Sequence, residues 1–222
     1  MCSSDKCWFK SVCDVSSDIC TSTCVKFLKM EYMMQNSNIP ENKQRPLALY
    51  PSECDLQAFN RLAEIKSDMR DFVWNGKNLY ITSKITGNGK SSWAMKLLMR
   101  YFDEMSEEDG KEIRGLFIHV PTFLIKLKDF NTTDEQFEDM KKLLPTVDLV
   151  IWDDIAGTNM SNYDYSQLLV YIDNRALNDL SNIYTGNLTS REDIASALGS
   201  KIASRIWNSN TEVVEFHGGD RR

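Results

Sequence analysis

Residues 79–92 read LYITSKITGNGKSS, an apolar run that leads into a glycine-bearing turn ending in Gly-Lys-Ser. Glycines let the backbone approach an anion, and the N–H groups of such a turn point at phosphate oxygens together with the positive end of the following helix. Lys90 would then reach the β- and γ-phosphates of a nucleotide, and Ser91 would ligate Mg²⁺. The stretch predicts a phosphate loop for ATP or ADP, with these cofactor-binding residues: Thr86, Gly87, Asn88, Gly89, Lys90, Ser91 and Ser92.

One position departs from the usual form of this loop. The motif has a glycine six residues before its lysine, and Lys84 stands there instead. The context still favours a phosphate loop over a chance turn on the surface, because a strand-like run precedes it. A helix is expected behind it, since apolar residues recur there at helical spacing: Trp93, Ala94, Leu97, Leu98 and Tyr101.

Residues 148–154 read DLVIWDD, an apolar run that ends in two acids. A parallel strand buried on both faces has this pattern, and its carboxyl end opens into the crevice where open α/β sheets bind ligands. Asp153 is placed to hold Mg²⁺ through water, and Asp154 to orient or deprotonate the water that attacks a γ-phosphate. The alternative is a strand that merely ends in a solvated acidic turn.

The composition limits the class of protein. The chain has 222 residues and a net charge of −6 at pH 7, which allows one domain of ordinary size with a small appendage. The acidic balance argues against a general nucleic-acid coat, since non-specific binding to phosphates needs an excess of basic residues. The apolar runs have the length of strands and the N-terminus lacks the features of a secretory signal, so we expect a cytoplasmic protein without a membrane span.

Five of the six cysteines lie in the first 24 residues. In a reducing compartment clustered thiols more often bind metal than form disulfides, so a structural Zn²⁺ site is one hypothesis. Its ligands would be Cys13, Cys20 and Cys24, with Cys7 as the fourth. The spacings are not the paired Cys-x-x-Cys of common zinc modules, and the alternative is free thiols packed in a small helical arm.

The chain divides into two predicted parts. Residues 1–45 are expected to form the cysteine-rich arm and a polar, proline-containing linker, and residues 46–222 an α/β domain. Apolar residues at helical spacing predict a helix from residue 56, which Asp55 can cap. Strand and helix patterns alternate from there, with strands expected before residue 83 and at residues 116–120, 149–152, 182–185 and 212–216. Such alternation predicts a parallel five-stranded sheet flanked by helices, joined by right-handed crossovers.

Two polar residues near the later strands are candidates for catalysis. Asn187 follows the fourth strand, where its amide could position an attacking water, although asparagine after glycine is also an ordinary turn residue. Arg205 lies one turn from Lys201 on a predicted helix. An arginine displayed there is suited to reach the ATP of a neighbouring subunit, and the alternative is a solvated helix arginine.

The order of these motifs resembles that of bacterial and phage replicative helicase loaders of the DnaC/DnaI type, which are AAA+ ATPases. The resemblance covers about residues 47–222 and rests on TGNGKSSWAMKL at 86–97, VIWDDI at 150–155, NLT at 187–189, LGSKIASR at 198–205 and FHGGDRR at 216–222. The arm, with its cysteines and the Ser-Asn-Ile-Pro turn at residues 37–40, also resembles the cysteine-bearing arm of Gram-positive and phage members.

The resemblance implies roles for matching residues. Asp154 would be the water-activating acid, Asn187 the sensor-I residue, and Arg205 the arginine finger that acts in trans. Arg222, or else Arg221, would be the sensor-II arginine that touches the γ-phosphate in cis. The helical insertion that contacts single-stranded DNA in the family would correspond to residues 121–144. There Lys126 and Lys128 would touch the DNA backbone, or else form a basic pair on a solvated helix.

The resemblance also implies a function. We expect an ATP-dependent replication protein that self-associates through its AAA+ domain and loads a hexameric DnaB-type helicase, gripped by the N-terminal arm, onto single-stranded DNA. Hydrolysis, weak alone and completed in trans between subunits, would let the nucleotide state control affinity for helicase and DNA. The alternatives are a transposition-helper AAA+ ATPase, a non-hydrolysing nucleotide-bound adaptor, and a small-molecule kinase, for which no arginine-rich lid is visible.

Overall fold

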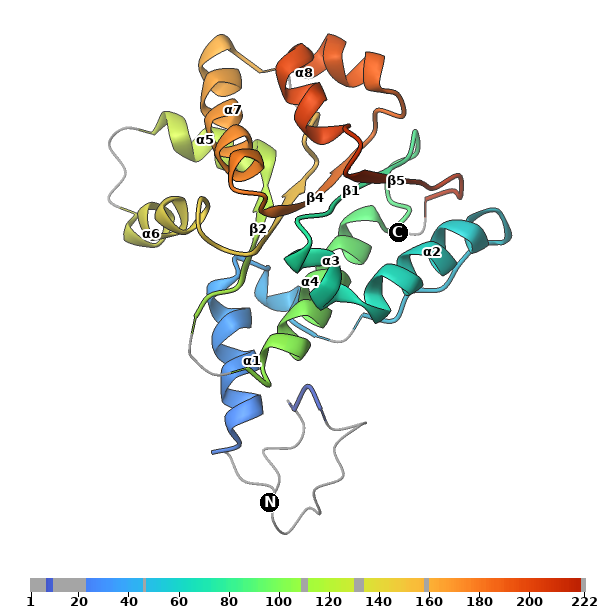
Figure 1. The fold of residues 1–222 in the computed structure, drawn as a ribbon. Coiled ribbons are helices and arrows are strands. Elements are labelled where there is room, and N and C mark those ends of the chain that lie inside the picture. The colour runs from blue at the N-terminus through green and yellow to red at the C-terminus, as the bar shows by residue number, and fades with distance from the viewer. Residues whose placement is uncertain are drawn as a thin grey trace.

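A computed structural model describes residues 7–9, 23–45, 47–108, 112–129, 134–157 and 160–220. Five strands form one parallel sheet in the order β2-β3-β4-β1-β5 (Figure 1). The predicted parallel five-stranded sheet is therefore confirmed. The strands are β1 (Asn78–Thr82), β2 (Gly115–His119), β3 (Leu149–Asp153), β4 (Ser181–Gly186) and β5 (Thr211–Glu215).

Helices cover both faces of this sheet (Figure 1). They are α1 (Val25–Asn36), α2 (Leu56–Ser67), α3 (Met69–Trp74), α4 (Lys90–Met105), α5 (Val120–Lys128), α6 (Glu135–Leu143), α7 (Asn162–Leu177) and α8 (Arg191–Ile206), with short 3-10 turns at Glu41–Lys43 and Glu53–Asp55. Within the described ranges, none of the helices has the length and hydropathy that a membrane span requires.

The strands alternate their side chains between two apolar clusters. Leu79 and Ile81 of β1 join the cluster that contains α1 to α4, whereas Tyr80 joins the cluster that contains α5 to α8. Because β1, β3 and β4 are buried on both faces, their residues must be apolar or hydrogen-bonded, which explains the apolar runs in the sequence. The carboxyl ends of β1, β3 and β4 consequently open at one edge of a sandwiched sheet.

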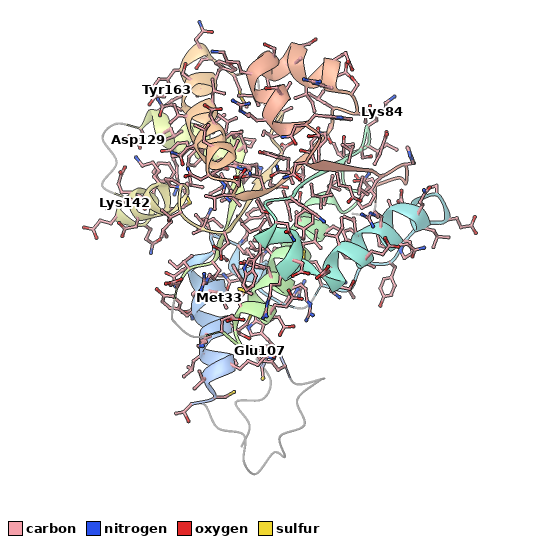
Figure 2. The ribbon with its side chains drawn as sticks, viewed as in Figure 1. Met33, Lys84, Glu107, Asp129, Lys142 and Tyr163 are labelled. Atoms are coloured by element: carbon pink, nitrogen blue, oxygen red, sulfur yellow. The ribbon has the colours of Figure 1, made fainter. Side chains whose placement is uncertain are left out.

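The segment that follows α1 runs along the edge strand β2. Three methionines of α1 are buried in the cluster that also holds α4, among them Met33, which is labelled in Figure 2. Farther on, the Ser37 carbonyl accepts a hydrogen bond from the Phe117 N–H (2.7 Å), and Asn38 Nδ2 donates to the Phe117 carbonyl (2.8 Å). The division of the chain at residue 45 stays a prediction, but the second half of the predicted arm shares the core of the α/β domain.

Arg175 of α7 is fully buried, and oxygen acceptors surround its guanidinium. Nε donates to Asn182 Oδ1 (2.7 Å). The terminal nitrogens donate to backbone carbonyls at 2.6–3.3 Å, those of Leu144, Val147, Asp148 and Ser181. Burial lowers the pKa of Arg175 to about 10, so the side chain keeps its charge at neutral pH. A buried charge is tolerated only with such compensation, and here it joins α7 to the starts of β3 and β4.

A second buried group, the Asp55 carboxylate, holds the segment that follows β5. Its Oδ1 accepts hydrogen bonds from the N–H groups of His217 (2.8 Å) and Gly218 (3.0 Å), and Ser52 Oγ donates to its Oδ2 (2.8 Å). Glycine suits position 218 because an added Cβ would lie 2.2 Å from Asp55 Oδ2. The expected capping of α2 by Asp55 is wrong, because its side chain makes no capping hydrogen bond to that helix.

The same C-terminal segment is also attached to β1. The Phe216 N–H donates to the carbonyl of Thr82, the last residue of β1 (2.8 Å). The Phe216 ring packs on Phe59 of α2, which in turn meets Trp93 of α4 edge-to-face. The chain beyond β5 is therefore fixed beside the strand that leads into the predicted phosphate loop.

We expect Arg175→Ala to lower the free energy of unfolding by about 3–5 kcal/mol, because it removes the donor to four backbone carbonyls, three of them in buried hydrogen bonds. Urea denaturation at neutral pH measures the change. The matched control is Arg61→Ala, since Arg61 is half exposed and pairs with Glu64 and Glu212 on the surface. That control should cost less than about 1 kcal/mol. Equal losses for both variants would contradict a special role for the buried guanidinium.

We expect Gly218→Ala to detach the C-terminal segment, whereas Gly219→Ala should not. The added Cβ at position 218 meets the Asp55 carboxylate, but nothing lies within 4 Å of a Cβ at position 219. Hydrogen exchange checks this, with faster exchange expected at the His217 and Gly218 amides in the first variant alone. Unchanged protection in Gly218→Ala would show that the segment is held by other contacts.

Candidate nucleotide site

The turn between β1 and α4 has a shape that its own side chains stabilise. Gly87 and Gly89 have φ angles of 74° and 100°, in the left-handed region that favours glycine. Asn88 is buried, and its Nδ2 donates to Ser83 Oγ (2.5 Å). Ser83 Oγ also accepts from the Ile85 N–H (3.1 Å). The predicted phosphate loop is therefore a turn held by side-chain hydrogen bonds, and its two glycines occupy the positions with positive φ angles.

Lys84 does not disturb this turn, although it stands where the motif has a glycine. Its φ is not positive, so the backbone there makes no demand for glycine. The side chain is exposed and lies at the outer margin of the molecule in Figure 2. The departure from the motif is thus compatible with the loop's conformation.

Lys90 begins α4 and folds back over the turn. Its Nζ donates to the carbonyl of Ile85 (3.0 Å) and to Asn88 Oδ1 (3.3 Å). Ser91 and Ser92 follow in the first turn of the helix and are half-buried. An ammonium group, a glycine turn and the N-terminus of a 16-residue helix converge here, which is the combination that binds phosphate.

The two acids at the end of β3 are linked through one hydroxyl group. Thr185 Oγ1 on β4 donates to Asp153 Oδ1 (2.7 Å) and accepts from the Asp154 N–H (3.0 Å). Asp153 and Thr185 are both buried. Thr185 is a site residue that the motifs in the sequence did not predict. The signal available was its place as the last side chain of the fourth strand, one strand over from the acids.

Asp154 has an unusual backbone conformation. Its φ is 56°, in the left-handed region that non-glycine residues seldom occupy. The turn is closed by hydrogen bonds from the Ile155 N–H to the Thr185 carbonyl (3.0 Å) and from the Gly157 N–H to the Asp154 carbonyl (2.9 Å). The Asp154 carboxylate lies over Gly157, where an added Cβ would be 2.0 Å from Oδ2. Such local strain persists where surrounding contacts enforce it, and it is common at functional sites.

The donor set suits Mg²⁺. Carboxylate and hydroxyl oxygens are the ligands that this hard cation prefers, and Asp153 and Ser91 supply one of each. Asp153 Oδ1 accepts a hydrogen bond from Thr185, and Oδ2 has no hydrogen-bond partner among the described residues. The role of Asp153 in holding Mg²⁺ through water stays a prediction.

Asn187 lies at the same edge of the sheet. It follows β4, whose last residue Gly186 pairs with Thr82 at the end of β1. The segment is held by Tyr80 Oη and Thr82 Oγ1, which both donate to the Leu188 carbonyl (2.8 and 2.7 Å). Three predicted parts of the site, the phosphate loop, the acids and Asn187, are thereby brought to one edge.

Arg205 lies elsewhere. Helix α8 bends at Gly199 (φ 78°, ψ 152°), and Arg205 is near its end, shortly before β5 begins at the amino edge of the sheet. Its Nε donates to Asp173 Oδ1 of α7 (2.7 Å). The phosphate loop opens at the opposite, carboxyl edge. Arg205 is therefore not brought together with the other candidate residues of its own chain.

Several predicted site residues lie outside the described residues, namely Cys13, Cys20, Arg221 and Arg222. Cys7 is half-buried and Cys24 is exposed, and both are free thiols. In the part of the chain that the structure describes, no group of three or more His, Cys, Asp or Glu side chains could hold a metal ion. The Zn²⁺ site and the sensor-II arginine stay predictions.

The predicted DNA-binding lysines are matched by acids. Lys126 Nζ pairs with Asp134 (2.8 Å), and Lys128 Nζ pairs with Asp164 (2.7 Å). Both lysines are about half exposed. Helices α5 and α6 do fill the stretch between β2 and β3 where the insertion was expected. The contact with single-stranded DNA stays a prediction.

No protein-family model and no curated protein sequence matches this chain. Solved structures do match it. The DnaC helicase loader aligns with a TM-score of 0.61 and 20% sequence identity, over 77% of this chain and 94% of that one. DnaI aligns with a TM-score of 0.59 and 17% identity, over 80% and 94%.

A replication initiator is also similar. DnaA bound to AMPPCP and single-stranded DNA aligns with a TM-score of 0.54 and 13% identity, over 86% of this chain and 52% of that one. At these identities the likeness concerns the fold. The chain therefore shares the α/β fold of the DnaC helicase loader and DnaI.

Proposed function

We propose that this protein is an ATP-dependent DNA replication factor that loads a DnaB-type hexameric helicase onto single-stranded DNA. The observation that carries the proposal is the convergence of the Lys90 loop and the Thr185-linked acids at one sheet edge. The shared fold with DnaC and DnaI supports it. A phosphate-binding loop beside a buried acid and a strained acid is an arrangement suited to nucleotide hydrolysis.

In the proposed mechanism the loop residues bind ATP. The N–H groups of the turn and of the first turn of α4 face the β- and γ-phosphates, and Lys90 exchanges the Ile85 carbonyl for a phosphate oxygen. Ser91 and the free oxygen of Asp153 would hold Mg²⁺, which supplies positive charge between the phosphates. Thr185 keeps the Asp153 carboxylate in one orientation by donating to its other oxygen.

Asp154 and Asn187 then act on the attacking water. The Asp154 carboxylate orients the water and accepts its proton as the bond to the γ-phosphate forms. The Asn187 amide positions the same water from the end of β4. Arg205 of a neighbouring subunit stabilises the charge that develops, and the products are ADP and phosphate. Hydrolysis is proposed to be slow until a second subunit supplies that arginine.

The nucleotide state would be transmitted to the N-terminal arm through β2. Asn38 and Ser37 bind Phe117 of β2, and β2 pairs along its length with β3, which carries the acids. A movement of Asp153 could therefore reach the segment proposed to bind the helicase through β3, β2 and Phe117. ATP hydrolysis would change the affinity of this protein for helicase and DNA and so release it.

The test is ATP hydrolysis by the purified protein and two variants, with and without single-stranded DNA and the replicative helicase. We expect helicase or DNA to change the rate. Lys90→Ala should remove MgATP binding, and Arg205→Ala should bind ATP normally but turn it over about 10²-fold more slowly or worse. Turnover that ignores both partners would favour a kinase-like enzyme, and nucleotide binding without turnover would favour a passive adaptor.

Helicase loading needs its own readout. We expect unwinding of a forked duplex by the helicase, on single-stranded DNA coated with its binding protein, to require this protein and ATP. Arg205→Ala should support binding to the helicase and fail at release. Unwinding that is equally fast without this protein would contradict the loader function while leaving the ATPase activity untouched.

We expect Thr185→Val to lower kcat for ATP about 10- to 100-fold with KM changed less than about threefold. The substitution keeps the shape of the side chain and removes the hydroxyl that orients both acids. Thr211→Val is the matched control, because Thr211 lies on β5 and its hydroxyl bonds only Asn208 among the described residues. The Thr185 assignment fails if the two variants hydrolyse ATP equally well.

A further inference from the structure

One ion pair holds Arg205 on its own subunit. Arg205 Nε donates to Asp173 Oδ1 at 2.7 Å, and both side chains are about 40% exposed. The bond uses Nε alone. Among the described residues the two terminal nitrogens have no hydrogen-bond acceptor, and the side chain is partly exposed.

This mode of attachment matters for phosphate recognition. A guanidinium binds phosphate or carboxylate oxygens best through two parallel N–H bonds. With Nε held by a carboxylate, the two terminal nitrogens remain in the plane of the group and stay available for such a bidentate contact. An arginine side chain otherwise loses rotamer entropy when it is ordered. Ordering it beforehand lowers the entropy cost of the later contact.

The backbone also directs Arg205 toward this position. The bend at Gly199 separates the second half of α8 from the first, and an added Cβ there would lie 2.9 Å from the Tyr165 ring of α7. Close packing on α7 therefore sets the direction of the half-helix that carries Arg205. Asp173 lies on the adjoining flank of α7, two turns beyond Tyr165.

The phosphate that Arg205 would meet belongs to another copy of the chain. Arg205 is near the amino edge of the sheet, since α8 ends just before β5 begins, whereas the phosphate loop lies beyond the carboxyl end of β1. A nucleotide bound to the same subunit would thus lie at the opposite end of the strands from Arg205. A second copy with a bound nucleotide has the matching negative charge.

We infer that Asp173 is a positioning residue, which holds Arg205 Nε so that its two terminal nitrogens present to the nucleotide phosphates of a neighbouring subunit. The inference rests on the proposed function, in which Arg205 acts in trans. It adds a residue, Asp173, whose side chain touches no nucleotide itself. Its effect on the reaction is exerted through the orientation of Arg205.

The exposed pair of Arg205 and Asp173 contributes little to stability, so a change in activity can be measured on a folded variant. Ion pairs of this exposure contribute little to folding stability, so removing the carboxylate leaves the fold intact. We expect Asp173→Ala to unfold within about 2 °C of the parent protein. Its kcat for ATP in the presence of helicase and DNA should fall about 5- to 20-fold, with KM changed less than about twofold. Asp173→Glu should recover part of the lost rate.

Two comparisons separate positioning from a general surface effect. Arg205→Ala combined with Asp173→Ala should be no slower than Arg205→Ala alone, because both changes act on one contact. Glu64→Ala is the matched control, since Glu64 also pairs with a single exposed cation, Arg61. That control should keep the parent rate. A kcat that rises in Asp173→Ala would overturn the inference, because Asp173 would then restrain Arg205 instead of presenting it.

Mixed subunits decide whether the effect acts across the interface. Arg205→Ala subunits can bind ATP, and Lys90→Ala subunits can supply Arg205, so their mixture should regain turnover. In a second mixture the Lys90→Ala subunit also carries Asp173→Ala. The recovered turnover should then be lower by about 5-fold or more. Equal recovery in both mixtures overturns the role of Asp173 and leaves the proposed function standing. No recovery in the first mixture removes the trans role of Arg205, and the inference with it.

Discussion

The buried guanidinium of Arg175 sets the register between β3 and β4. One of its terminal nitrogens donates both to the carbonyl of Asp148, just before β3, and to that of Ser181, the first residue of β4. A slip by one residue would separate these carbonyls from their donor and turn every side chain of a strand to the other face. Since β3 and β4 are buried on both faces, a slipped strand would still bury its apolar side chains. Hydrophobic burial therefore discriminates between registers less than it does in a sheet with one face in water. The charge therefore stabilises one pairing over its alternatives.

The candidate nucleotide site depends on that pairing at the opposite end of the same strands. With β3 and β4 in register, Thr185 lies where its hydroxyl can donate to Asp153 and accept from the Asp154 N–H. The left-handed conformation of Asp154 is then enforced by the Thr185 carbonyl and by the lack of a side chain at Gly157. A strained acid is maintained because the neighbouring strand leaves it no relaxed alternative.

The fold places the residues proposed to bind the nucleotide far from the arginine proposed to complete hydrolysis. The loop and acids are at the carboxyl edge of the sheet, while Arg205 is held by Asp173 near the amino edge. In the proposed mechanism one subunit binds ATP and the next supplies the charge that makes hydrolysis fast. The contacts of Ser37 and Asn38 with β2 join the N-terminal segment to the same sheet, so assembly, hydrolysis and partner binding would share one rigid element.

The sequence by itself determined the elements whose signals are local. The glycine turn before Lys90, the acids after an apolar run and the alternation of strands with helices were all predicted, and the parallel sheet was confirmed. These features depend on spacing within about ten residues, which sets periodicity and turn geometry.

Only the tertiary structure decided the contacts that join distant segments. Thr185 meets Asp153 across 32 positions, Asp173 meets Arg205 across 32, and Asp55 meets Gly218 across 163. Asp55 illustrates the reason: its place before α2 predicted a helix cap, but folding put two backbone N–H groups of the C-terminal segment within reach of its carboxylate. Strand register and helix packing create such neighbours, and no local pattern in the chain encodes them.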